Sequence, residues 1–205
     1  DINSVFIFTH DSIYLGEDGP THQPIEHLMS LRLIPNVDVI RPSNSIEIDH
    51  SYRYAFSDSK NPKVLSLTRQ DLDYLDFDVK YEEFLKGGYV VSDGDDFTIV
   101  ASGSELEIAF KIKAALLEYS VRIVSVPILN KLSNMKNEEI NELLKNKHVF
   151  PIELGRSIGW ESYLGRITKT FSIDSFGESA PIEDLEKNFG FDVPSITKEI
   201  IKYLN

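Results

Sequence analysis

The chain has 205 residues, of which 41% are hydrophobic and 26% are charged, and this composition excludes a disordered protein. Its 21 basic and 33 acidic residues give a net charge of −12, which argues against nucleic acid or an anionic membrane surface as the main partner. The absence of cysteine excludes a disulfide scaffold, a thiolate nucleophile and a zinc–thiolate site. Because no apolar run is long enough to span a membrane and the first residues do not resemble a signal peptide, we expect a cytoplasmic protein.

Seven short runs of apolar and β-branched residues predict strands. Most of these runs are continuous rather than alternating, which is typical of strands that are buried on both faces of a sheet. In chain order they are Val5–Thr9, Val37–Ile40, Val64–Thr68, Phe97–Ala101, Val121–Val126, Val149–Glu153 and Phe171–Ile173.

Five stretches with helical spacing lie between or after these runs, and the alternation of strand and helix predicts a mostly parallel sheet. They are Pro24–Leu31, Ile46–Phe56, Glu105–Tyr119, Asn137–Leu144 and Pro194–Leu204. Ser102, followed three residues later by Glu105, predicts a capping box at the start of the third helix.

An acidic, weakly periodic segment at residues 71–88 predicts a surface crossover between two α/β units, with the boundary near residue 76. The fold class that we expect is therefore α/β with two three-layer units. The first, residues 1–75, is too small for a complete domain and is expected to be truncated. The second, residues 76–205, is expected to have a mixed, mostly parallel sheet flanked by helices.

The segment with the most potential for chemistry is the loop after the first strand, THDSIYLGEDGPTHQP at residues 9–24. It leaves the carboxyl end of a strand, which is the edge where parallel α/β sheets bind ligands. The residue types alone leave three interpretations open. The loop is a turn with a helix cap, a metal site such as zinc built from His10, Asp11, Asp18 and His22, or a pair of imidazoles for proton transfer or phosphate contact.

The same loop, with the helix and strand that follow it, closely resembles transketolases, the thiamine-diphosphate enzymes that move two-carbon ketol units between sugar phosphates. The contiguous run GEDGPTHQP is too long and unusual in composition for a chance match. Further resemblances follow in the family's order and extend over essentially the whole chain: LTRQ at 67–70, KGGY at 86–89, ASGSE at 101–105, ELGRSIGW at 153–160 and DSFGESAP at 174–181.

The resemblance implies roles for four residues. His10 and Arg69 resemble the histidine and the arginine that hold the substrate phosphate, and a guanidinium suits that group because it binds phosphate with two parallel hydrogen bonds. Asp18 resembles the aspartate that recognises a substrate hydroxyl next to the reacting carbon. His22 resembles a catalytic histidine that contacts oxygens at the reacting end and assists proton transfer. Tyr14 departs from the family pattern, because many relatives carry a smaller residue there.

The resemblance also shows what this sequence lacks. The family's GDG motif, which together with a later Asn holds the cofactor diphosphate and a divalent metal, does not occur. The glutamate that activates the cofactor's aminopyrimidine and the aromatic residues that hold that ring are expected upstream of Asp1. The complete enzyme is therefore expected to be a homodimer that binds thiamine diphosphate and a divalent cation, Mg or Ca. The cofactor-binding residues stay unknown, and no cofactor or metal is expected on this chain itself.

The function that we expect is part of a transketolase, a transferase of the pentose phosphate pathway that acts on sugar phosphates and contacts neither nucleic acid nor membrane. The chain alone is expected to be inactive, and a fragment is favoured over a split subunit. One alternative is a non-catalytic α/β interaction module, or a split subunit, that kept the transketolase scaffold. A second is a metal-dependent hydrolase that uses His10, Asp18 and His22.

Overall fold

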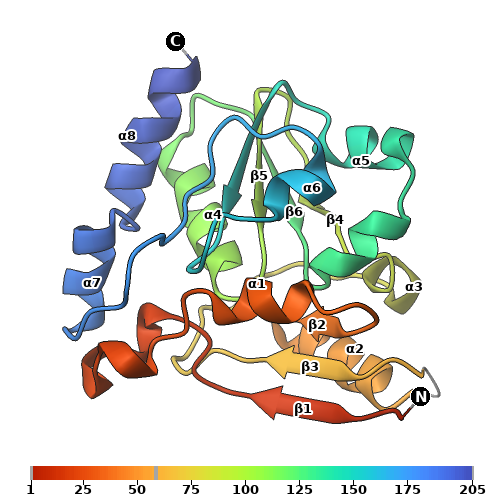
Figure 1. The fold of residues 1–205 in the computed structure, drawn as a ribbon. Coiled ribbons are helices and arrows are strands. Elements are labelled where there is room, and N and C mark those ends of the chain that lie inside the picture. Colours follow the sequence, from red (N-terminus) through yellow and green to blue (C-terminus); the bar gives the residue numbers. More distant parts are fainter. Residues whose placement is uncertain (1, 58–59, 205) are drawn as a thin grey trace.

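The computed structural model describes residues 2–57 and 60–204, and its strands form two separate sheets (Figure 1). The first sheet has the strand order β1 (Val5–Phe8), β3 (Lys63–Ser66), β2 (Asp38–Ile40), and both pairings are parallel. All three carboxyl ends therefore lie at one edge of the sheet.

The second sheet has the order β4 (Tyr89–Ser92), β6 (Val121–Ser125), β5 (Phe97–Ala101), β7 (His148–Ile152). The central strand β5 pairs in parallel with both neighbours, whereas β4 runs antiparallel to β6 at the edge. The predicted α/β fold with a mixed, mostly parallel second sheet is confirmed.

Helices cover both faces of the second sheet, which makes this unit three-layered (Figure 1). On one face, a core around Ile99 and Phe150 packs under three helices: α4 (Glu105–Ala115), α7 (Ile182–Phe189) and α8 (Val193–Leu204). On the other face, a core around Val100 and Val124 packs under η3 (Leu129–Asn134), α5 (Asn137–Leu144) and α6 (Trp160–Leu164).

The two units pack closely against each other. Helix α2 (Ser45–Ala55) shares a core with β2 and β3 that also contains Phe84 of α3 (Tyr81–Phe84) and Ile128 of the second unit. Helix α1 (His27–Arg32) lies between the two sheets, where its Met29 joins the core around Val100 (Figure 1). The acidic segment at 71–88 is thus more than a surface crossover, because Leu75, Val79 and Phe84 are buried.

The structure corrects several predicted elements. Residues 171–173 do not form a strand; Phe171 makes one isolated bridge with Ile152 beside β7. The predicted capping box is absent, since α4 has Ser104 at its N-cap position and Glu105 instead bonds residues from distant parts of the chain. Strand β4 and helices α3, α6 and α7 were not predicted. Within the described residues, no helix has the length and apolar character needed to cross a bilayer.

Candidate functional site

The loop after β1 and the segment after β3 meet at the carboxyl edge of the first sheet. The main-chain N–H of Leu67 donates to the carbonyl of Phe8 at 2.8 Å, so the parallel pairing continues to the ends of both strands. His10 and Arg69 therefore follow neighbouring strand ends. Between His10 and α1, the loop folds into two 3-10 turns, η1 (Ile13–Asp18) and η2 (Pro20–His22).

The structure brings His10 and His22 together. Both exposed histidines line one cavity of about 610 Å³ at this edge, together with Asp11 and Ser66. Each ring shares a hydrogen bond through Nδ1 with the preceding threonine hydroxyl, at 2.7 Å for His10 and 3.1 Å for His22. The His10 backbone has a φ of +66°, a conformation that residues other than glycine rarely adopt and that surrounding structure has to hold in place.

Asp18 and Arg69 line a second cavity, of about 450 Å³, which His10 and His22 do not reach. Arg69 is exposed and forms no ion pair with any described residue, so its guanidinium is available to an anion. The other charged residues of this cavity, Glu17, Glu183 and Asp184, are acidic. The four predicted residues thus occupy two sites in pairs, and their individual roles stay predictions.

The far end of the loop is held by Gln23, which sequence reasoning missed. Its buried amide nitrogen donates to the carbonyls of Ile13 and Gly16 at 3.2 Å, and its amide oxygen accepts from the main-chain N–H of Glu178 at 2.9 Å. A Cβ atom on Gly177 would lie only 2.5 Å from the Gln23 oxygen, so glycine permits this close approach. One side chain therefore closes the loop on itself and attaches it to the second unit.

Tyr14 forms another bond from the loop to the second unit. Its hydroxyl donates to Glu186 of α7 at 2.7 Å. Burial, reinforced by the hydrogen bond to this carboxylate, raises the pKa of Tyr14 far above its usual range, so the phenol stays protonated as a donor.

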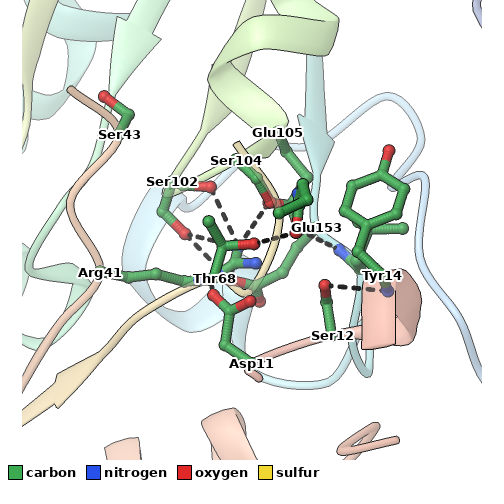
Figure 2. A network of polar contacts seen from close by, with 12 residues as sticks. Asp11, Ser12, Tyr14, Arg41, Ser43, Thr68, Ser102, Ser104, Glu105 and Glu153 are labelled. Carbon is green, nitrogen blue, oxygen red and sulfur yellow. Dashed lines mark hydrogen bonds and ion pairs between the residues drawn. The ribbon is translucent and has the colours of Figure 1, made fainter. Parts of the chain in front are cut away.

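A buried cluster of charges joins the start of the loop to the second unit (Figure 2). The Arg41 guanidinium bonds Asp11 through Nε at 2.7 Å and Glu105 through Nη1 at 2.7 Å, and all three side chains are almost fully buried. Burial by itself would lower the pKa of Arg41, but the carboxylates of Asp11, Glu105 and Glu153 outweigh it and raise the pKa. Arg41 is therefore a permanent cation between two units.

A second arginine from the first unit extends this cluster. Arg32 of α1 places Nη1 at 2.8 Å from both carboxylate oxygens of Glu153, which also accepts the indole N–H of Trp160 at 2.8 Å. Sequence reasoning missed both arginines of this cluster, because the partners of Arg32 and Arg41 lie far away in the chain. The one local signal was that Arg41 directly follows a predicted strand and Glu153 ends another.

The metal interpretation of the loop has no support in the structure. Across residues 2–57 and 60–204, no group of three or more His, Asp or Glu side chains is arranged to hold a metal ion. His10 and His22 line one cavity and Asp18 another, so these three residues do not converge. The residues that the structure describes therefore offer no set of ligands for a divalent cation.

Two family models match the chain. Residues 1–73 match the pyrimidine-binding domain of transketolase, and residues 87–192 match the transketolase-like C-terminal domain. The transketolase of Bacillus subtilis (strain 168) is 39% identical over 98% of this chain, and the chloroplastic transketolase of Zea mays is 40% identical over 94%. This chain spans only 32% and 30% of those two relatives.

Solved structures agree with the sequence comparisons. The transketolase from Leishmania mexicana superposes with a TM-score of 0.88 at 36% identity, covering 96% of this chain and 29% of that protein. A Pichia stipitis transketolase described as a complex with sedoheptulose 7-phosphate has a TM-score of 0.87 at 33% identity, covering 96% of this chain and 29% of that protein.

Proposed function

This chain belongs to the transketolase family, and from that membership we propose that it supplies the substrate-binding part of a transketolase, an enzyme that transfers a two-carbon ketol unit between sugar phosphates. The observation that carries the proposal is the placement of the family's loop, with His10 and His22 lining one cavity at the carboxyl edge of a parallel sheet. The size of this cavity, about 610 Å³, suits a small ligand. A related protein is described in complex with sedoheptulose 7-phosphate, which supports a sugar phosphate as the substrate class.

The phosphate of the substrate is assigned to His10 and Arg69. They follow neighbouring parallel strands at one edge of the sheet but line separate cavities, so their joint assignment rests on the family resemblance and places the phosphate between the two cavities. The guanidinium of Arg69 forms no ion pair with another described residue and can bind two phosphate oxygens at once, while the His10 imidazole adds one donor. Local cations matter in this chain because its net charge of −12 repels an anionic substrate.

The reacting end of the substrate is assigned to Asp18 and His22. An exposed carboxylate such as Asp18 accepts hydrogen bonds from sugar hydroxyls without a large desolvation cost. The His22 ring is anchored at Nδ1 by Thr21, which leaves Nε2 to exchange a proton with a substrate oxygen.

The rest of the machinery is assigned to the complete enzyme. Thiamine diphosphate, when bound, carries the two-carbon unit, and its ligands and those of a divalent cation are proposed to lie outside the residues described here. We expect the complete enzyme to be a cytoplasmic homodimer of the pentose phosphate pathway, without nucleic-acid or membrane partners. The 205-residue chain alone is proposed to be inactive.

The test is an assay of the complete enzyme that contains this chain, with xylulose 5-phosphate as donor and ribose 5-phosphate as acceptor. We expect Asp18→Ala and His22→Ala each to lower kcat/KM with this donor and with the non-phosphorylated donor hydroxypyruvate, because both residues are assigned to the reacting end. Glu118→Ala, which alters an exposed acidic residue that lines neither cavity, is the control and should be near wild type. Absence of ketol transfer by the unmodified enzyme would reject the proposal.

A further inference from the structure

Arg41 belongs to the first unit by sequence but is enclosed by the second. Its main-chain N–H donates to the carbonyl of Pro127 at 2.8 Å, and its own carbonyl accepts from Gly103 at 3.0 Å. Its Nη1 also donates to the carbonyl of Ser102 at 3.0 Å. A Cβ atom on Gly103 would lie 2.8 Å from Cγ of Arg41, so the Arg41 side chain packs directly against the backbone of a glycine that has no space for a larger residue. The guanidinium is therefore fixed relative to the second unit.

Asp11 depends on this guanidinium. Its Oδ2 accepts from Nε of Arg41 at 2.7 Å, whereas its Oδ1 is buried and has no hydrogen-bond partner among the described residues. Asp11 directly follows His10, whose φ of +66° is costly for a residue with a Cβ atom. The bond between Asp11 and Arg41 thus holds the peptide that sets the direction of the His10 side chain.

The other end of the loop is held separately. Gln23 bonds the main chain of the loop and of Glu178, next to His22. The second unit therefore holds the loop at separate points, one beside His10 and one beside His22, with the bond from Tyr14 to Glu186 between them. Loss of the first point is expected to displace His10 while His22 stays in place.

We propose that Asp11, Arg41 and Glu105 form a positioning relay through which the C-terminal unit sets the place of His10 in the substrate cavity (Figure 2). The proposal rests on the proposed function and deepens it, because it gives the C-terminal unit a part in substrate recognition. Glu105 is the remote member: it contacts Arg41, the Ser104 hydroxyl and the main-chain N–H of Leu154, and does not line the cavity of His10.

The experiment is a double-mutant cycle between Glu105→Gln and His10→Ala in the complete enzyme. Glu105→Gln keeps the shape of the side chain but removes the charge that fixes Arg41. We expect kcat/KM for xylulose 5-phosphate to fall roughly 10-fold, mainly through a higher KM, because a displacement of about 1 Å at a binding group lowers the rate by up to about 100-fold. With hydroxypyruvate, kcat/KM should change less than about 2-fold. In the His10→Ala background, Glu105→Gln should have no further effect.

Two controls separate the relay from general damage. Glu107→Gln changes a carboxylate on the same helix, but Glu107 bonds Lys111 and the main-chain N–H of Asp73 and not Arg41, so the kinetics of this variant should match wild type. Asp11→Asn removes the charge at the other end of the relay and should reproduce the donor-selective loss, which keeps the test decisive if Glu105→Gln does not fold.

Equal losses with both donors, or additive losses in the double mutant, would overturn the relay while leaving the proposed function intact. An unmodified enzyme without ketol transfer would overturn the proposed function and the relay with it.

Discussion

Replacement of Arg41 by methionine tests how strongly the buried charges hold the two units together. Arg41→Met keeps the length of the aliphatic chain and removes a guanidinium that is 1% exposed and lies 2.7 Å from each of two carboxylates. Glu105 would retain its bonds from the Leu154 N–H and the Ser104 hydroxyl, but the Asp11 carboxylate would lose its one hydrogen-bond partner among the residues that the structure describes. The variant therefore leaves one buried carboxylate unpaired and another partly compensated.

The expected loss in the free energy of unfolding is about 3–5 kcal/mol, the cost of leaving a buried charge without its partner. In a chain of 205 residues this corresponds to a fall in Tm of about 6–20 °C. Both quantities are measured by urea and thermal unfolding of the 205-residue chain. The loss should be smaller at pH 5 than at pH 8, because burial raises the pKa of Glu105 and removal of the Arg41 charge raises it further, so protonation removes part of the penalty of burying this carboxylate.

The matched control is Arg156→Met, which removes an arginine whose side chain is 36% exposed and lies 3.4 Å from Asp174. A surface pair of this kind contributes about 0–1 kcal/mol. If Arg41→Met lowers the free energy of unfolding no more than Arg156→Met does, or if this loss does not depend on pH, the buried cluster does not stabilise the contact between the two units.

Three further predictions address other contacts. Gly103→Ala should destabilise the chain by about 1–3 kcal/mol more than Gly165→Ala in urea unfolding, because both glycines have positive φ but only a Cβ on Gly103 would collide with Arg41; equal costs would argue against this close contact. Tyr14→Phe should lower the free energy of unfolding by about 1–3 kcal/mol at pH 7. It should also reduce the fall in that free energy above about pH 10, because the phenol then ionises in the unfolded chain while its raised pKa keeps it protonated in the folded chain. An unchanged pH profile would show that the bond to Glu186 is not made. The isolated chain should not convert xylulose 5-phosphate and ribose 5-phosphate, and turnover by it would contradict the proposed division of the active site.

Three of the four strands of the second sheet, β5, β6 and β7, were predictable because their signal is local. Phe97–Ala101 and Asn137–Leu144 form β5 and α5 with the predicted bounds, since a continuous apolar run and a regular helical pattern each fix one element. Strand β4 gives a weaker signal, because it is a short, partly exposed edge strand that directly follows the glycines at 87–88. The 171–173 run was wrong as a strand because its apolar residues are buried beside β7 without a continuous ladder.

The site was predictable only in part, for a related reason. The loop from Thr9 to Pro24 is contiguous, so its histidines and carboxylates can be recognised together in the sequence. The buried cluster is not contiguous: Arg41 pairs with Asp11 across 30 positions, and Arg32 with Glu153 across 121. Glu105 shows the consequence, because its local spacing from Ser102 indicates a capping box while its real partner is Arg41.

Arg69, which is assigned to the substrate phosphate, lies in a cavity that makes this assignment easy to test. Among the residues lining its cavity, Arg69 is the one arginine or lysine and faces Glu17, Asp18, Glu183 and Asp184. If a phosphate binds beside these carboxylates, removal of the guanidinium should strongly weaken the binding of the phosphorylated substrate. Loss of one charged hydrogen-bonding partner costs about 1.5–3 kcal/mol, which is roughly 10- to 150-fold in kcat/KM.

The most direct measurement of the central claim is kcat/KM of the complete enzyme with Arg69→Ala, for xylulose 5-phosphate and for hydroxypyruvate, with His10→Ala measured in parallel. For Arg69→Ala we expect a loss of roughly 10- to 150-fold with the phosphorylated donor and near wild-type values with hydroxypyruvate, and for His10→Ala a loss in the same direction. Equal losses with the two donors would contradict this claim, because Arg69 would then be structural and the phosphate would bind elsewhere.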